Sequence, residues 1–131
     1  MANLAHGTFD VQLKPQPLAH GEDATRGRLS IDKQFHGDIA GTSVGEMLSA
    51  GTATAGSAGY VALERVAGTL HGRSGSFVLQ HSGTMTRGVG QLSITVVPDS
   101  GTDELEGLAG SMRLIISGGE HAYEFEYTFG E

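Results

Sequence analysis

Residues 31–48, IDKQFHGDIAGTSVGEML, contain the pattern that decides the fold. On both sides of the turn GDIAG, apolar and polar residues alternate with a period of two, which is typical of strands that bury one face. The phase with the apolar residues is the predicted inner phase, and it consists of Ile31, Lys33, Phe35, Val44, Glu46 and Leu48. The stretch therefore predicts a β-hairpin whose buried face includes two charged residues.

A turn with Ile39 and Ala40 at its tip places Lys33 opposite Glu46. The same register matches apolar residues with each other, in the pairs Phe35–Val44 and Ile31–Leu48. Two interpretations of the charged pair stay open. At a wet barrel rim the pair contributes little to stability. Inside the barrel, the cost of burying two charges indicates a ligand or a proton transfer, which makes Lys33 and Glu46 candidate catalytic residues.

Alternation of the same kind recurs along most of the chain, and helical periodicity is nearly absent. Further strands are expected at about residues 9–13, 60–71, 76–87, 91–97, 111–117 and 121–129. The polar loop at 14–27 is long enough to form a rim or a lid, and the segment 98–110 is expected to contain one helical turn capped by Thr102. Eight strands without a covering helix favour an all-β single domain, residues 1–131, built as a closed antiparallel barrel. A two-sheet sandwich is the alternative.

The second long hairpin, at residues 60–85, brings an acid and a base onto one predicted inner face. With Arg73 and Ser74 at the tip, the predicted pairs are Leu70–Phe77, Gly68–Leu79, Val66–His81 and Glu64–Gly83. Glu64 and His81 can then act as an acid and a base, or they form a structural hydrogen bond. Both interpretations stay open, and the two residues join Lys33 and Glu46 as candidate catalytic residues.

The same inner face supplies the residues expected to line a ligand pocket. They are Tyr60, Phe77, Leu79, Tyr123 and Tyr127. The interior of an eight-stranded barrel is either filled by side chains or holds one small ligand. Buried tyrosine hydroxyls need hydrogen-bond partners, so these residues favour a compact apolar or phenolic organic ligand. No cofactor is indicated.

Composition excludes several classes of function. The chain of 131 residues has no Cys, which excludes disulfides and thiolate metal sites. Its net charge of -7 opposes binding to nucleic acid or to anionic lipid. The six His residues show no metal-binding spacing, so no metal site is expected. A signal peptide and a membrane span are not apparent, which predicts a cytoplasmic protein.

Three apolar residues occupy the predicted outer phase, namely Val61, Leu63 and Ile115. Such side chains are too many for a fully solvated exterior, and they predict a homo-oligomer of unspecified order. A non-catalytic barrel that acts through contacts of this kind is the alternative to a ligand-binding function.

Four stretches resemble a family of small bacterial proteins called domain of unknown function 3224. They are GRLSIDKQFHGDIAGTSVGEMLSAGT, GSAGYVALERVAGTLHGRSGSFVLQHSGTM, VVPDSGTDELEGLAG and HAYEFEYTF, within a resemblance that spans about residues 6–129. Members of the family look like the barrel of allene oxide cyclases and dirigent proteins, which implies the closed barrel rather than the sandwich. Those enzymes steer the cyclisation or coupling of apolar or phenolic intermediates. The resemblance implies isomerase-like chemistry only by analogy of fold, because no catalytic motif of theirs aligns with Glu46, Glu64 or His81.

Overall fold

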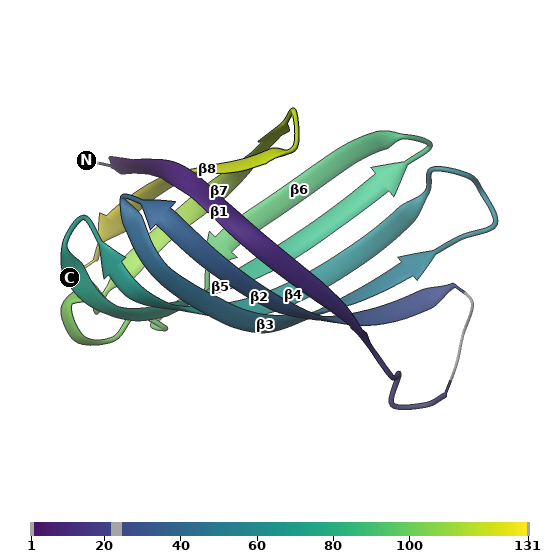
Figure 1. The fold of residues 1–131 in the computed structure, drawn as a ribbon, viewed down its shortest axis with the longest axis horizontal. Coiled ribbons are helices and arrows are strands. Elements are labelled where there is room, and N and C mark those ends of the chain that lie inside the picture. Colours follow the sequence, from purple (N-terminus) through teal and green to yellow (C-terminus); the bar gives the residue numbers. More distant parts are fainter. Residues whose placement is uncertain (1, 22–24, 131) are drawn as a thin grey trace.

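Eight consecutive antiparallel strands close into a barrel in the computed structural model, which describes residues 2–21 and 25–130 (Figure 1). The strands are β1 (Asn3–Gln16), β2 (Arg26–Gly37), β3 (Ile39–Gly51), β4 (Ala58–Leu70), β5 (Arg73–Thr86), β6 (Val89–Val96), β7 (Leu108–Ser117) and β8 (Glu120–Phe129). Each strand pairs with the next, and β1 pairs with β8 to complete the circle. The predicted closed barrel is confirmed.

The two ends of the barrel differ. At the left end in Figure 1, the segment between β6 and β7 contains the short 3-10 helix η1 (Asp103–Leu105), and Leu105 is only 1% exposed. We call this the plugged end. At the opposite end, four inward-facing apolar residues are 46–65% exposed, namely Leu13, Met85, Leu92 and Ile116. We call this end the mouth, because the interior is accessible to solvent there.

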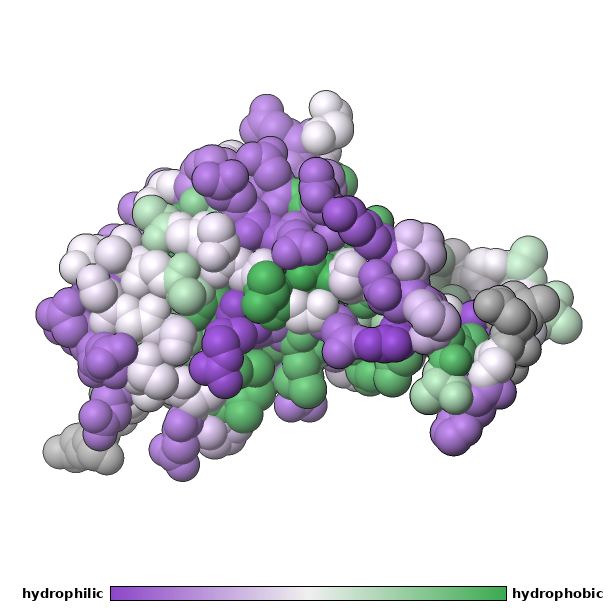
Figure 2. All heavy atoms as spheres, turned by 60° about the horizontal axis from the view of Figure 1, so that its bottom comes forward, coloured by the Kyte–Doolittle hydropathy of each residue, from purple (hydrophilic) through white to green (hydrophobic). Residues whose placement is uncertain are grey.

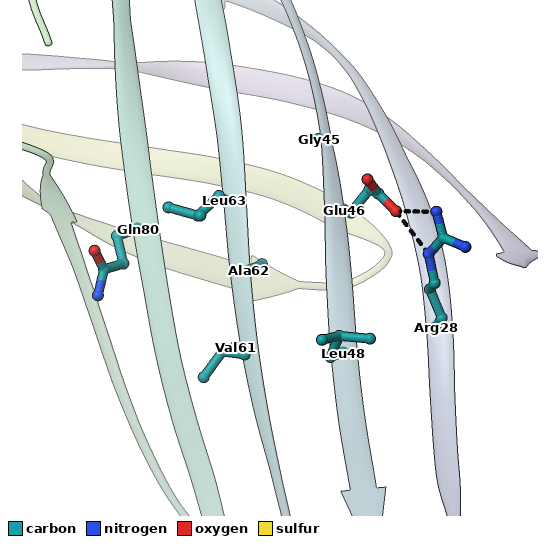
Figure 3. Close-up of a pocket in the computed structure, with 8 residues that line it drawn as sticks. All are labelled: Arg28, Gly45, Glu46, Leu48, Val61, Ala62, Leu63 and Gln80. Carbon is teal, nitrogen blue, oxygen red and sulfur yellow. Dashed lines mark hydrogen bonds and ion pairs between the residues drawn. The ribbon is translucent and has the colours of Figure 1, made fainter. Parts of the chain in front are cut away.

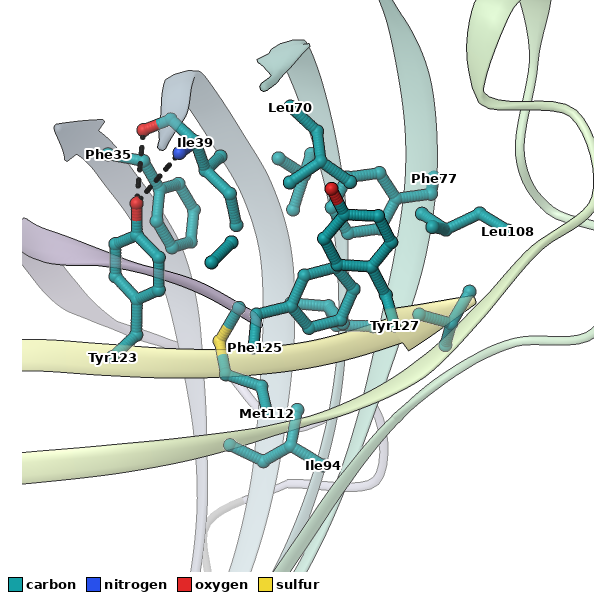
Figure 4. Packing of buried hydrophobic residues seen from close by; sticks show 14 of the residues in the cluster. Phe35, Ile39, Leu70, Phe77, Ile94, Leu108, Met112, Tyr123, Phe125 and Tyr127 are labelled. Atoms are coloured by element: carbon teal, nitrogen blue, oxygen red, sulfur yellow. Dashed lines mark hydrogen bonds between the residues drawn. The ribbon is translucent and has the colours of Figure 1, made fainter. Parts of the chain in front are cut away.

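Aromatic and aliphatic side chains fill the plugged half of the interior (Figure 4). Phe77 of β5 stacks on Phe125 of β8 with ring centroids 5.8 Å apart, and Phe125 stacks in turn on Tyr127. Phe35 meets Tyr123 edge-on at 5.6 Å. The inward-facing aromatic residues predicted for β8 therefore form a packed core, whose burial from water is the main source of stability.

The predicted register of the first hairpin is wrong. β2 and β3 meet in a tight turn centred on Asp38, which Gly37 permits by adopting a φ of 100°. Lys33 consequently lies opposite Ser43 and not opposite Glu46. Because this shift is an odd number of residues, it reverses which phase of β3 faces inward.

The inner phase of β3 consists mostly of small residues, namely Ile39, Gly41, Ser43, Gly45, Met47 and Ser49. Small residues are required because β4 lies very close. A Cβ atom added to Gly45 would lie 2.1 Å from the carbonyl oxygen of Leu63. The apolar residues Val44 and Leu48 therefore stand on the outer surface, which is the opposite of the sequence-based expectation.

The second hairpin turns earlier than predicted but keeps its predicted faces. His71 and Gly72 form a two-residue turn with φ values of 47° and 81°, so the tip does not lie at residues 73–74. Glu64 faces Leu79 instead of the residue four positions further along the chain. Since four is an even number, every side chain predicted to face inward from β4 and β5 still does so.

The predicted helical turn exists as η1, but its predicted cap is wrong. The Thr102 hydroxyl makes no capping hydrogen bond, and it accepts instead the backbone N–H of Ser76 in β5 at 3.0 Å. The centre of the predicted lid at 14–27 lies outside the described residues, and the flanking parts extend β1 to Gln16 and begin β2 at Arg26. No helix in the described ranges is long and apolar enough to cross a membrane.

Candidate functional site

Four consecutive strands each contribute one polar side chain to a cluster inside the barrel. The residues are Lys33 of β2, Ser43 of β3, Glu64 of β4 and His81 of β5, and all four are buried. We call them the Glu64 cluster, because the other three each donate a hydrogen bond to that carboxylate. The predicted neighbourhood of Glu64 and His81 is confirmed, and Lys33 joins them in place of its predicted pairing with Glu46.

The carboxylate of Glu64 is held in its ionised form. Oε1 accepts the Ser43 hydroxyl at 2.7 Å, while Oε2 accepts Lys33 Nζ at 2.9 Å and lies 2.5 Å from His81 Nε2. Burial raises the pKa of Glu64, but the hydrogen bond from His81, the charge of Lys33 and the bonds from Lys33 and Ser43 lower it to about 2. Because an ionised carboxylate only accepts hydrogen bonds, the Nε2 atom of His81 carries the donated proton.

This depressed pKa predicts a defined loss of stability in acid. The folded-state pKa of about 2 lies below the ordinary value of 4.5, so the contribution is complete above about pH 5 and is lost as the pH falls toward 2. The difference corresponds to roughly 3 kcal/mol. Between pH 7 and pH 3, the free energy of unfolding measured in urea should therefore fall more steeply for the wild type than for Glu64→Gln. Parallel declines in this free energy would contradict the depressed pKa.

The buried polar atoms of the Glu64 cluster already have partners inside the protein. Lys33 Nζ also lies 4.8 Å from the centre of the Phe9 ring, within the range of a cation–π contact. In the described part of the chain, no buried side-chain nitrogen or oxygen lacks a hydrogen-bond partner. A carboxylate with a pKa near 2 is also a weak base at neutral pH. These properties fit a structural ion pair better than a catalytic base.

Glu46 lies on the other side of the sheet from the Glu64 cluster. Its side chain is 59% exposed, and its Oε1 atom accepts the Nε–H of Arg28 at 2.7 Å. The predicted pair with Lys33 is wrong because the reversed phase of β3 directs Glu46 outward. The structure thus separates it from the three other residues predicted as catalytic.

Four of the five predicted ligand-binding residues lie in the packed core, namely Phe77, Leu79, Tyr123 and Tyr127. The Tyr123 hydroxyl accepts the N–H of Ile39 at 2.8 Å and donates to the carbonyl oxygen of His36 at 2.9 Å. The Tyr127 hydroxyl is hydrogen-bonded to His71 Nδ1. Burial raises the pKa of both tyrosines. Both hydroxyls therefore form hydrogen bonds within the barrel at its plugged end.

The fifth residue, Tyr60, lines an apolar hollow of about 400 Å³ at the mouth. The inward-facing residues of this mouth hollow include Met47, Tyr60, Gly83, Met85, Gly90 and Leu92. The Tyr60 ring lies directly on Gly83, where an added Cβ would be 2.4 Å from Cε1 of the ring. Burial raises the pKa of Tyr60 above 10.0, and the charge of Glu64 raises it further. At neutral pH the phenol is protonated and can donate a hydrogen bond.

Sequence reasoning missed most of the mouth hollow. Met85 and Leu92 share the inner phase of β5 and β6 with predicted inward residues, and this phase was the available signal. Met47 was missed because the predicted register assigned the opposite set of β3 residues to the interior. Ser43 in the Glu64 cluster gave no signal, because a serine between glycines in a strand fits either face.

The histidines are scattered over the barrel. His36 pairs with Asp10 on the outer face at 3.0 Å, and His71 lies 3.4 Å from Asp38 at the plugged end. Among residues 2–21 and 25–130, no group of three or more His, Asp or Glu side chains is placed to hold a metal ion.

These features define a small closed β-barrel with one plugged end, a buried ion cluster and an apolar mouth. The chain belongs to the DUF3224 family, described as "Protein of unknown function", whose sequence profile matches residues 5–127. A crystal structure of a DUF3224 protein of unknown function from Shewanella oneidensis MR-1 is similar, with a TM-score of 0.94 and 48% sequence identity over 100% of this chain and 99% of that one. No curated protein matches the chain. The family resemblance is confirmed, and the likeness to allene oxide cyclase stays a prediction.

Proposed function

We propose that the protein binds a compact, largely apolar organic molecule in the mouth hollow. The observation that carries this proposal is the space of about 400 Å³ that inward-facing residues leave at the accessible end of the barrel. Binding sites for small molecules are typically concave and apolar, with a few polar groups that fix the orientation of the ligand. The mouth hollow has this character, and Tyr60 supplies a polar group.

The lining favours a flat or aromatic ligand with a hydrogen-bond acceptor. Met47 and Met85 provide polarisable sulfur atoms that adapt to different shapes and contact aromatic rings favourably. Gly90 leaves room beside them, and Gly83 accommodates the ring of Tyr60. The protonated phenol of Tyr60 can donate to a carbonyl, ether or phenolic oxygen of the ligand.

The contribution of the Glu64 cluster to this function is structural in our proposal. Lys33, Ser43, Glu64 and His81 connect β2 to β5, and three of these strands, β3, β4 and β5, also line the mouth hollow. The hydrogen bonds of this cluster join the other three residues to the Glu64 carboxylate. Tyr60 lines the hollow, and the negative charge of Glu64 contributes to raising its pKa. Any isomerase-like proton transfer would therefore involve the Tyr60 hydroxyl directly, with Glu64 acting through its charge.

Binding can be tested with N-phenyl-1-naphthylamine, an uncharged probe that becomes fluorescent in apolar surroundings. We expect saturable binding by the wild type and at least a tenfold weaker affinity for Leu92→Trp, because the larger ring occupies part of the hollow that the probe needs. The matched control is Ile115→Trp, which places the same side chain on the outer face of β7 and should bind as the wild type does.

Equal binding by both variants, or no saturable binding by the wild type, would contradict the mouth hollow as the site. Native mass spectrometry of the protein purified from cells would add the mass of any molecule that remains bound.

A second candidate function is a non-catalytic barrel that acts through its outer surface. The packed core of the plugged half favours it, because self-filling leaves little of the interior for a ligand.

A further inference from the structure

The outer surface of β3 to β6 is nearly free of acidic groups. In these four strands, all of whose residues the structure describes, Glu46 is the one acidic side chain that faces outward, and Arg65 lies near it. Acidic residues gather instead on β1, β2, β8 and the segment with η1, where they include Asp10, Asp32, Asp103, Glu104, Glu124 and Glu126. A chain with a net charge of -7 thus has one side with almost no acidic groups.

The same side also carries an apolar patch. It consists of Val44 and Leu48 of β3 with Val61 and Leu63 of β4, which are 52–59% exposed. Leu48 and Val61 are direct neighbours across the two strands, and Figure 3 shows Leu63 near them, with Arg28 beyond Glu46. Glu46 lies opposite Leu63 and separates Leu48 from Val44 along β3. We call these four residues the β3–β4 patch. It borders a shallow hollow of about 570 Å³.

A space-filling view shows the same kind of surface. Figure 2 brings the bottom of Figure 1 forward, and hydrophobic side chains gather in the lower middle of this face beside strongly hydrophilic ones. The other exposed large hydrophobic residues on outer faces are more dispersed, such as Leu4 on β1 and Ile115 on β7. Val61 and Leu63, but not Ile115, therefore belong to one patch.

We propose that the β3–β4 patch is the contact between two copies of this chain, related by a two-fold axis. Two molecules of net charge -7 repel each other, so they associate most readily through the side where acidic groups are absent or paired. A stable interface needs about 800 Å² and roughly 20–30 residues from each partner. Four adjacent long strands offer a surface of that extent, with apolar residues near its middle.

The charges beside the patch are self-complementary. Glu46 is bound by Arg28 of its own chain, while Arg65 makes no ion pair with any residue that the structure describes. Arg65 and Glu46 are diagonal neighbours on the outer face, and a two-fold axis that passes between them places Arg65 of each copy opposite Glu46 of the other copy. The same pair then forms twice, as required when one surface contacts itself.

Sedimentation velocity from about 1 to about 100 μM, a range that covers moderate protein affinities, tests the proposal. We expect the wild type to dimerise and Leu63→Glu to raise the dissociation constant at least tenfold, because it buries an unpaired charge in each half of the interface. Leu4→Glu is the matched control, since Leu4 is equally exposed but lies on the outer face of β1. It should leave the dimer intact.

A second pair of variants tests the charges without altering the apolar residues. Arg65→Glu should weaken the dimer, because it faces Glu46 of the partner, whereas Arg113→Glu on β7 should not. A monomeric wild type throughout the range would overturn the proposal. So would a trimer, or a dimer that Leu4→Glu disrupts and Leu63→Glu does not. The Leu63→Glu variant should still bind N-phenyl-1-naphthylamine as the wild type does. This measurement distinguishes a failure of the proposed dimer from a failure of the proposed ligand site.

Discussion

Replacing Glu64 with glutamine is expected to lower the free energy of unfolding by about 3–5 kcal/mol, the cost of leaving one charge of a buried pair without its partner. The substitution preserves the shape of the side chain but removes the negative charge. Lys33, 8% exposed and 2.9 Å from Glu64, would then remain buried without a counter-ion. Urea unfolding at pH 7, followed by circular dichroism, measures the loss directly.

Glu46→Gln provides the control for this experiment. The same chemical change is made at the residue next to Gly45, the sheet neighbour of Glu64, but on the outer surface. An exposed ion pair such as Glu46 with Arg28 contributes about 0–1 kcal/mol, so the expected loss is small. Equal losses for the two variants would show that the Glu64 cluster is not the buried network described above.

Replacing Gly45 with alanine is expected to destabilise the barrel by about 3 kcal/mol, at the upper end of the cost of overpacking. The added Cβ would lie 2.1 Å from the Leu63 carbonyl oxygen and 2.7 Å from the Glu64 Cα. Both are backbone atoms, which cannot move away by rotating a side chain. The strands β3 and β4 must separate, and Glu64 must move with them.

Gly59→Ala separates this steric effect from a general effect of replacing glycine in a strand. Gly59 lies near the start of β4, and an added Cβ would be 3.7 Å from its nearest neighbour, an ordinary contact distance. We expect a change of less than about 1 kcal/mol, because surface substitutions without a clash are nearly neutral. Thermal unfolding of the two variants side by side measures the contrast. A loss for Gly45→Ala no larger than that for Gly59→Ala would contradict the close approach of β3 and β4.

The fold could be predicted from the alternation of apolar and polar residues, because this pattern survives errors in register. In β4 and β5 the predicted turn was misplaced, yet the shift was even, so Glu64 and His81 still faced the same interior. In β8 the alternation of aromatic and acidic residues correctly predicted the buried side. Period-two reasoning is reliable wherever the inner phase is also the more apolar one.

The strand β3 violates that condition, and most errors follow from it. Its inner phase contains Gly41, Ser43 and Gly45 because the barrel wall is closely packed there, while Val44 and Leu48 stand outside. Hydrophobicity alone therefore selected the wrong face and paired Lys33 with the wrong acid.

The outward position of Val44 and Leu48 is itself informative. Apolar residues that are missing from the inner phase of a strand and present on the outer one indicate a surface that something else covers. The β3–β4 patch thus connects a failure of sequence-based prediction with the proposed dimer.

The mouth hollow as the ligand site is the central claim, and a titration of the ¹⁵N-labelled protein with N-phenyl-1-naphthylamine, followed by amide chemical shifts, tests it most directly. We predict saturable shifts concentrated at Met47, Tyr60, Gly83 and Leu92, which line the hollow on four different strands. Amides of the core residue Phe125 should change little. Shifts confined to the β3–β4 patch, or no saturable shifts at all, would contradict the claim.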